Sequence, residues 1–198
     1  MAFLQAGDRR NWRDAEFLAL DFETTSGDPR RAEPLSVGWV VVANGRVRVS
    51  DAAYHLIDHD GQVPVASLQI HRLVPAELAG GLTVDGVAER LRSALDGRVA
   101  VVHGSWIERA LLKRMAVARQ PLIDTLAVVR RLDEREGNHL EPASLSAVAR
   151  RCGVPPLRAH HAFGDALTTA LLLLALAGRL ERERSRCVVD DLLRLGRP

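Results

Sequence analysis

The feature that most restricts the fold is a short apolar run, Phe17-Leu18-Ala19-Leu20, that leads directly into Asp21-Phe22-Glu23-Thr24-Thr25. An apolar run bounded by turn residues is typical of a buried strand, and Ser26-Gly27-Asp28-Pro29 provides the turn. Because side chains alternate along a strand, Asp21 and Glu23 are expected on one face, at the end of a sheet. Two carboxylates that close repel each other unless a cation lies between them. The pattern therefore predicts a cation site, against the alternative of two polar residues in an exposed loop.

Length and composition favour a single domain with little net charge. The chain has 198 residues, of which 47% are hydrophobic, and a formal net charge of +2, so it can bury one core. No large cationic field is expected, although a local groove can still hold phosphates. We expect an N-terminal arm over residues 1–14, a main domain over 15–182, and a C-terminal helix or tail over 183–198 that packs on or beside that domain.

Three further features favour a cytoplasmic protein without a membrane partner. Cys152 and Cys187 are too few for a disulfide framework, which fits a reducing compartment. Residues 1–13 lack the apolar core of a secretory signal. The longest apolar run, Ala170 to Ala177, is too short to cross a bilayer and indicates a buried helix.

A β-hairpin is predicted after the first strand. Leu35 to Ala43 and Arg46 to Ile57 have the composition of strands, and Asn44-Gly45 joins them. Because that dipeptide accepts the positive φ angles of a type I′ turn, the two strands should pair antiparallel.

The second half of the chain alternates short strands with helices. The β-rich runs Val99 to Val102 and Leu122-Ile123 are each followed by a helical stretch. Such alternation predicts parallel β-α units, and hence an α/β fold with a mixed sheet covered by helices on both faces. The expected helices cover residues 65–73, 84–95, 106–119, 125–135, 144–152, 162–180 and 188–195.

Two later carboxylates have both a structural and a functional interpretation. Glu108 ends the stretch His103-Gly104-Ser105-Trp106-Ile107-Glu108 and lies in the first turn of a predicted helix, level with the carboxyl end of the sheet. Ser105-x-x-Glu108 also matches a capping box, which the spacing alone favours. Asp124 precedes another helix, where capping is favoured over catalysis.

A third motif, His160-His161-Ala162-Phe163-Gly164-Asp165, opens the longest helix. Asp165 lies in the first turns of that helix, whereas His160, five residues earlier, belongs to the preceding loop. A loop histidine beside a metal-binding carboxylate can approach a reacting water, and an ordinary imidazole pKa near ~6.5 suits a general base. Taken alone, the stretch is more typical of surface histidines ahead of a helix.

The order of the three motifs along the chain favours the functional interpretation over the structural one. D-x-E, then H-x4-E, then H-x-A-x-x-D resembles the DEDD superfamily of 3′-5′ exonucleases, in the DnaQ-like subgroup (DEDDh) whose third motif carries a histidine. The resemblance runs from about Glu16 to Leu180 and includes the flanking stretches Ile70-His71 with Pro75 and Ser144 to Gly153. It implies a ribonuclease H-like fold with a mixed five-stranded central sheet of three antiparallel strands followed by two parallel ones.

The resemblance also implies roles for particular residues. Asp21, Glu23, Asp165 and Glu108 would hold two divalent cations, Mg²⁺ or Mn²⁺, and His160 would be the general base. Glu108 stands where the family usually has Asp, and Gly104, Ser105 and Ile107 are further departures from its second motif. The substrate-binding positions would be Thr24 and Thr25, beside the 3′-terminal nucleotide, and His103.

The implied activity is hydrolysis of single-stranded nucleic acid from the 3′ end to nucleoside 5′-monophosphates. DNA is favoured, and the alternatives are an RNA-trimming enzyme and a catalytically silent module that binds nucleic acid or a polymerase. The arm before Asp14 and the Arg-rich segment Arg179 to Arg186 are the places where a polymerase or repair partner would bind. Sequence alone leaves the oligomeric state open.

Overall fold

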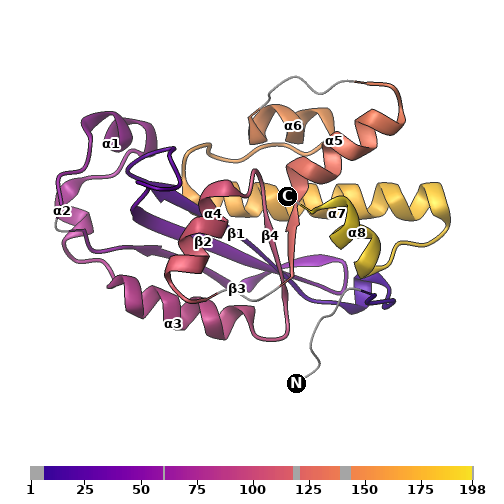
Figure 1. The fold of residues 1–198 in the computed structure, drawn as a ribbon, viewed down its shortest axis with the longest axis horizontal. Coiled ribbons are helices and arrows are strands. Elements are labelled where there is room, and N and C mark those ends of the chain that lie inside the picture. The colour runs from indigo at the N-terminus through magenta and orange to yellow at the C-terminus, as the bar shows by residue number, and fades with distance from the viewer. Residues whose placement is uncertain (1–6, 60, 118–120, 139–143, 198) are drawn as a thin grey trace.

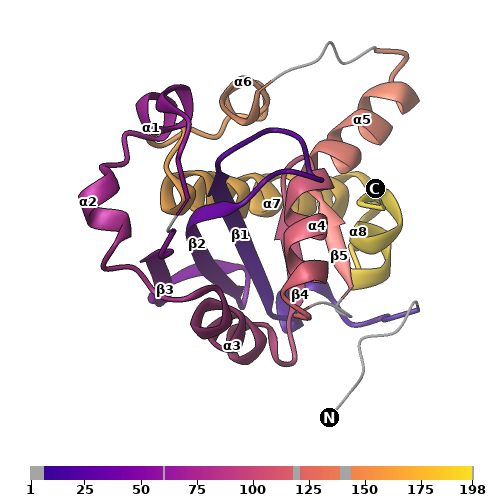
Figure 2. The same ribbon diagram turned by 60° about the vertical axis from the view of Figure 1, so that its left-hand side comes forward.

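The protein, described by a computed structural model, is built on one five-stranded sheet (Figures 1 and 2). The strand order is β3-β2-β1-β4-β5, with β1 antiparallel to β2, β2 antiparallel to β3, and β1, β4 and β5 mutually parallel. This confirms the predicted mixed sheet. The structure describes residues 7–59, 61–117, 121–138 and 144–197. The strands are β1 (Phe17–Thr24), β2 (Pro34–Ala43), β3 (Arg46–Leu56), β4 (Val99–Val102) and β5 (Leu122–Asp124).

Helices cover both faces of the sheet, as predicted. Helices α3 and α4 pack on one face, and α5, α6, α7 and α8 pack on the other (Figure 2). The helices are α1 (Val65–His71), α2 (Pro75–Leu78), α3 (Val84–Leu95), α4 (Trp106–Arg114), α5 (Thr125–Arg135), α6 (Leu145–Arg151), α7 (Ala162–Arg184) and α8 (Val189–Leu195); a short 3-10 turn, Trp12–Asp14, precedes β1.

Strand β1 is central because both of its faces are buried. Phe17 and Ala19 face the core shared with α5 to α8, whereas Leu18 and Leu20 face the core shared with α3 and α4. All four side chains are fully buried, which explains why this strand is a continuous apolar run. The polar residues that follow this run are therefore held at the edge of a rigid sheet.

The predicted hairpin is confirmed. Asn44 and Gly45 have φ angles of 53° and 66°, as a type I′ turn requires. Strands β2 and β3 pair antiparallel on either side of this turn.

Gly38 on β2 allows α7 to approach the sheet closely. Gly38 lies opposite Asp21 in the β1–β2 register, and a Cβ atom at this position would collide with the backbone of Ala162 and Phe163. The first turn of α7 can therefore lie directly against the sheet, which brings Asp165 next to Asp21.

Three helices end two or more residues from the predicted position. Helix α1 ends at His71 instead of Leu73, because Arg72 adopts a left-handed φ of 56°. Helix α4 ends at Arg114 instead of residue 119, because Ala116 adopts a left-handed φ of 51° and the Val117 amide bonds back to the Leu112 carbonyl. Such a reversal is the usual way in which a helix ends. Helix α7 continues past Leu180 to Arg184. Part of the predicted 106–119 helix, residues 118–119, lies outside the described residues.

Helix α7 is the one helix among the described residues that is long and apolar enough to cross a membrane by length and composition. Much of its surface is instead buried in the core, where Ala170, Leu173 and Leu176 pack among residues of the sheet and of other helices. The helix therefore has the burial expected of a core helix.

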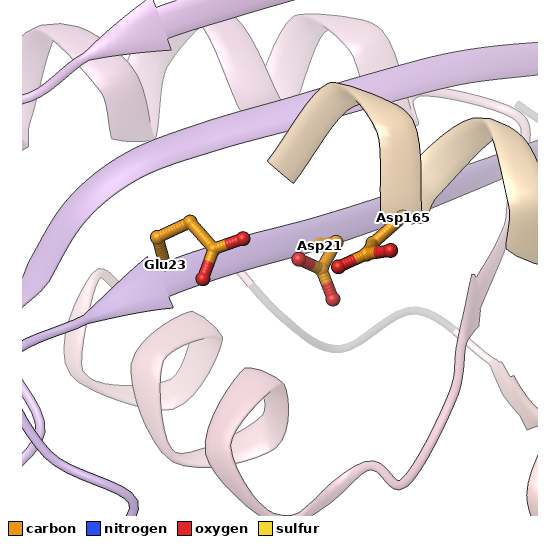
Figure 3. Close-up of side chains that lie close together, drawn as sticks. All are labelled: Asp21, Glu23 and Asp165. Atoms are coloured by element: carbon orange, nitrogen blue, oxygen red, sulfur yellow. The ribbon is translucent and has the colours of Figure 1, made fainter. Parts of the chain in front are cut away.

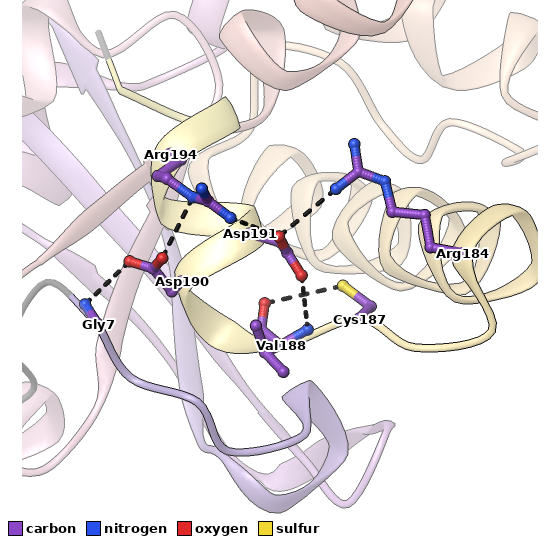
Figure 4. Close-up of polar contacts among 7 residues, drawn as sticks. All are labelled: Gly7, Arg184, Cys187, Val188, Asp190, Asp191 and Arg194. Atoms are coloured by element: carbon purple, nitrogen blue, oxygen red, sulfur yellow. Dashed lines mark hydrogen bonds and ion pairs between the residues drawn. The ribbon is translucent and has the colours of Figure 1, made fainter.

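The C-terminal segment is joined to the N-terminal segment by polar contacts (Figure 4). Asp190 of α8 accepts a hydrogen bond from the Gly7 amide and pairs with Arg194, while Asp191 accepts one from the Val188 amide and pairs with Arg184. Arg184 of the predicted partner-binding segment Arg179 to Arg186 is therefore already paired within the chain.

The predicted domain boundaries stay a prediction.

Candidate active site

Three carboxylates converge at the carboxyl end of β1. Asp21 and Glu23 come from this strand and Asp165 from the first turn of α7, and ligand oxygens of the three lie within 4.8 Å of one another. Figure 3 shows Asp21 between the other two. The D-x-E spacing places both strand carboxylates on one face, as predicted, and Gly38 permits the approach of the third.

Burial and the crowding of negative charge raise the pKa values of two of these carboxyl groups. Burial, and then the charges of Glu108, Glu23 and Asp165, raise the pKa of Asp21 well above its ordinary value. Burial and the charge of Glu23 raise the pKa of Asp165 to about 6, although hydrogen bonds from the amides of His160 and His161 act in the opposite direction. Asp21 and Asp165 therefore bind protons more readily than isolated carboxyl groups do, and a bound cation would relieve the same excess of negative charge.

Glu108 is buried beside this cluster without capping α4. Its side chain is only 6% exposed, and Ser105 makes no side-chain cap and has helical φ and ψ angles of −64° and 0°, so the capping-box interpretation is wrong. Burial raises the pKa of Glu108 to about 8. A hydrogen bond from its own backbone amide acts in the opposite direction, and the charges of Asp124 and Glu23 add smaller increases. Among the described residues, Glu108 lies outside the group of carboxylates that converge within 4.8 Å.

Asp124 caps α5, as predicted, and also fixes the turn that carries Glu108. Its carboxylate accepts hydrogen bonds of 2.9 Å from the amides of Leu126, Gly104 and Ser105. The capping role was evident from the sequence. The bonds to the β4–α4 turn depend on β4 and β5 being neighbours in the sheet, which aligns their carboxyl ends.

His71 is a site residue that the sequence analysis did not identify. Its Nδ1 contacts Oε2 of Glu23, and its Nε2 lies 3.2 Å from the carbonyl oxygen of Thr24. The adjacent helix α1 is also held by Ser67, whose hydroxyl donates to the Thr25 carbonyl at 2.9 Å. The only sequence signal was the position of His71 in a stretch flanking the motifs, because no spacing rule relates it to Glu23.

His160 lies in the loop before α7, as predicted. It is exposed and has a left-handed φ of 58°, and its backbone amide donates to Oδ2 of Asp165 at 2.9 Å. The ring centroids of His160 and His71 are 6.3 Å apart. Because His71 contacts Glu23 directly, His160 borders the carboxylate cluster from the solvent side.

The predicted substrate-binding residues lie around the same edge of the sheet. Thr24 donates its hydroxyl to the Ser26 carbonyl at 2.9 Å, and the Thr25 hydroxyl accepts from the Glu33 amide at 3.1 Å. His103 Nδ1 lies 2.9 Å from the Thr125 hydroxyl, and burial lowers the pKa of His103 to about 4, so that it is neutral. Their contact with substrate stays a prediction.

The residues of the site fit a divalent cation. Glu23 Oε1 and Glu108 Oε2 are buried, and neither has a hydrogen-bond partner among the described residues. A buried carboxylate oxygen without a donor is costly unless an ion or a proton satisfies it. A set of carboxylate oxygens is the donor chemistry that Mg²⁺ and Mn²⁺ prefer.

The fold is that of several nucleases. Exonuclease X, solved with 5′-overhanging duplex DNA, superimposes with a TM-score of 0.71 at 19% identity, over 91% of this chain and 99% of that one. Escherichia coli exonuclease I, solved with a dA16 oligonucleotide, gives 0.71 at 16% identity, over 85% and 42%. Cell-death related nuclease 4 gives 0.70 at 17% identity, over 84% and 65%. The architecture is therefore that of the ribonuclease H-like exonucleases.

Comparison of sequences identifies the family. The profile of the exonuclease family (RNase T) matches residues 18–173, and the chain belongs to this family of DnaQ-like proteins. It is 27% identical over 182 residues to the PolC-type DNA polymerase III of Thermotoga maritima and 28% identical over 177 residues to a DNA polymerase III subunit epsilon-like protein of Rhodobacter capsulatus. These alignments cover 88% and 83% of this chain but only 13% and 24% of those relatives.

Proposed function

We propose that the chain is a metal-dependent 3′-5′ exonuclease that removes nucleoside 5′-monophosphates from single-stranded nucleic acid, with DNA preferred. The observation that supports this most directly is the convergence of Asp21, Glu23 and Asp165 within 4.8 Å, with His160 at the border of the cluster. Membership of the exonuclease family supports the reaction class, and the DNA oligonucleotides bound to two structural neighbours support the choice of DNA.

The carboxylates have a binding role in this proposal. Asp21, Glu23 and Asp165, with Glu108 beside them, would hold two divalent cations, Mg²⁺ or Mn²⁺. Such ions, when bound, lower the pKa of a water and neutralise the charge that develops on the departing 3′ oxygen. The His71 contact holds the Glu23 carboxylate in one orientation, so that this ligand needs no rearrangement.

In this proposal, His160 accepts the proton that the attacking water releases. Its imidazole lies on an exposed loop next to the cluster, so a neutral ring can accept a proton from the attacking water and pass it to solvent. The bond from the His160 amide to Asp165 ties this loop to the carboxylate cluster. Base and metal ligand are thereby held together by one short segment.

The test uses oligonucleotides of equal sequence in DNA and RNA form, labelled at the 5′ end and incubated with Mg²⁺, Mn²⁺ or EDTA. We expect a ladder of products that shortens stepwise from the 3′ end of DNA, with no cleavage in EDTA. Faster shortening of RNA would replace the DNA preference with an RNA-trimming activity. Internal cuts, or turnover in EDTA, would contradict the proposal.

Variants link the activity to the cluster. Asp165→Ala and Glu23→Ala should abolish hydrolysis while circular dichroism shows a folded protein. The matched control is Glu89→Gln, which alters an exposed carboxylate on α3 and should retain wild-type turnover. Turnover in either cluster variant would assign the activity to another site or to a contaminant.

A further inference from the structure

A groove with a volume of about 510 Å³ lies between α4 and α5, and four of the residues that line it are arginines, in contrast to the acidic site. The arginine–tryptophan groove, as we call it, includes Trp106, Arg109, Arg130, Arg131, Glu134 and Arg197. Figure 2 shows these two helices on either side of the β4–β5 edge of the sheet, near the C-terminus.

The arginines of the groove are available for a ligand. Arg109, Arg130 and Arg197 are exposed, and none of their side chains forms an ion pair within 4.0 Å among the described residues. Arg131 differs, because its guanidinium donates to the carbonyl oxygens of Leu195 and Arg197 and so fixes one wall of the groove. Three unpaired guanidinium groups against one exposed acid, Glu134, make a site for phosphates.

Trp106 adds an aromatic surface to this positive groove. It is 57% exposed and is the only aromatic residue among the large hydrophobic side chains that the described part of the chain exposes. Its ring lies over Gly104, where a Cβ atom would come within 2.9 Å of the ring. Any other residue at position 104 would therefore displace the ring, and the position of Trp106 depends on this glycine.

The groove and the acidic site share one turn of α4. Trp106 and Arg109 lie on the same side of the helix, three residues apart, whereas Glu108 is turned into the protein. Asp124 anchors this turn through the amides of Gly104 and Ser105. Because a helix with its side chains is about 10–12 Å across, the groove lies roughly one helix width from Glu108, a distance that a few nucleotides can span.

We infer that the arginine–tryptophan groove binds single-stranded nucleic acid upstream of the 3′ end, with phosphates on Arg109, Arg130 and Arg197 and a base stacked on Trp106. Positive side chains that follow the backbone, together with an aromatic side chain that accepts any base, are the general means of binding single strands without sequence preference. The inference extends the proposed exonuclease function, because it assigns the substrate that enters the acidic site a second contact surface.

The binding test is separate from catalysis. Fluorescence anisotropy in EDTA, where no hydrolysis occurs, gives the Kd of labelled DNA strands of 4 and 12 nucleotides. We expect the Kd of wild type for the 12-nucleotide strand to be lower than that for the 4-nucleotide strand by about 10-fold or more. The double variant Trp106→Ala with Arg130→Gln should lose this dependence of Kd on length. Trp106→Phe should keep part of it, because a phenyl ring still stacks. Arg90→Gln, on the exposed side of α3, is the matched control and should bind as wild type does.

Intrinsic fluorescence gives a second readout. Trp12 and Trp39 are buried, with exposures of 2% and 5%, so quenching by a bound oligonucleotide should come mainly from Trp106 and disappear in Trp106→Phe. Equal affinity of wild type and double variant for the 12-mer, or no quenching at saturation, would overturn the groove assignment. If wild type binds but never hydrolyses DNA, the exonuclease proposal fails and the groove assignment stands.

Discussion

The acidic site and the arginine–tryptophan groove lie on opposite sides of the same turn of α4, yet they are built in opposite ways. The acidic site gathers carboxylates from β1, α4 and α7, raises the pKa values of Asp21, Glu108 and Asp165, and buries two carboxylate oxygens that have no partner among the described residues. The groove gathers exposed arginines, three of which lack ion-pair partners among the described residues. Among the described residues, each site therefore has more charge of one sign than its neighbours neutralise, which indicates a ligand of the opposite sign.

The two sites are expected to differ in how well they tolerate amino-acid substitutions. Asp21, Glu23 and Asp165 are each fixed by the sheet register or by a specific contact, such as that of His71 with Glu23, so a single substitution among these three should remove the function of the whole group. In the groove, each exposed arginine would contact the ligand independently of the others and remains open to solvent on one side. We therefore expect large, non-additive effects in the first site and small, additive effects in the second.

The largest effect is expected for Asp21→Asn. The amide keeps the shape of the side chain but cannot supply the charge that neutralises bound cations, so kcat/KM should fall roughly 10³-fold or more. Thermal unfolding in EDTA should show a higher Tm than wild type, because the substitution removes a carboxyl group whose charge is costly to bury and is repelled by its neighbours. A loss of activity below 10-fold would show that Asp21 is not part of a cation site, and a lower Tm would contradict the buried negative charge.

His160→Ala should reduce kcat by about 10²-fold, as expected for the loss of a general base. The measurement is the dependence of kcat on pH, which should lose the limb that reports the base. His161→Ala provides the comparison, since its ring stacks on Tyr54 with a centroid distance of 4.6 Å and should affect kcat only slightly. An unchanged pH profile in His160→Ala would remove the proposed role.

Glu108→Gln should reduce kcat/KM by roughly 10- to 100-fold, the range typical of groups that support a metal site. The effect is expected to be smaller than that of Asp21→Asn because Glu108 lies outside the group that converges within 4.8 Å. The apparent affinity for Mn²⁺, measured by titrating activity, should weaken in the same variant. A loss as large as that of Asp21→Asn would make Glu108 an equal ligand.

The stability of the metal-free protein should fall as the pH rises from about 4 to 8. Asp165 and Glu108 have folded-state pKa values of about 6 and about 8, above their ordinary values of 3.8 and 4.5. The folded state thus holds protons that the unfolded state releases, and this contribution to stability is lost as pH rises through those values. The Tm in EDTA should drop by about 5 °C or more over this range. Glu108→Gln should flatten the curve, and an equal slope in that variant would contradict the assignment.

The smallest effect is expected for the single change Arg130→Gln. Losing one phosphate contact should weaken binding of a 12-nucleotide strand by about 3-fold and reduce the slope of log Kd against log salt by about 0.7. Anisotropy at three salt concentrations measures both quantities. An unchanged salt slope would exclude Arg130 from phosphate contact, and a loss of several hundred-fold would show that the groove is as cooperative as the acidic site.

Much of the fold could be predicted because its signals are local. The apolar run before Asp21, the Asn44-Gly45 turn and the later alternation of strands and helices each depend on neighbouring residues. The D-x-E spacing likewise places two carboxylates on one face whatever surrounds them. Helix ends were less accurate, since α4 stops at Arg114 through a left-handed residue at Ala116 that no glycine signals.

Three-dimensional packing alone decided how the sites were completed. The contact of His71 with Glu23 and the close approach of α7 over Gly38 join residues that are far apart in the sequence and that no periodic spacing relates. The placement of the Trp106 ring over Gly104 likewise follows from the fold of the turn and not from a periodic spacing. Glu108 illustrates the same limit, because its spacing from Ser105 favoured a cap, whereas burial turned it toward the acidic site. Sequence periodicity therefore determined which face each residue occupies, and the folding of distant segments against one another decided which charges meet.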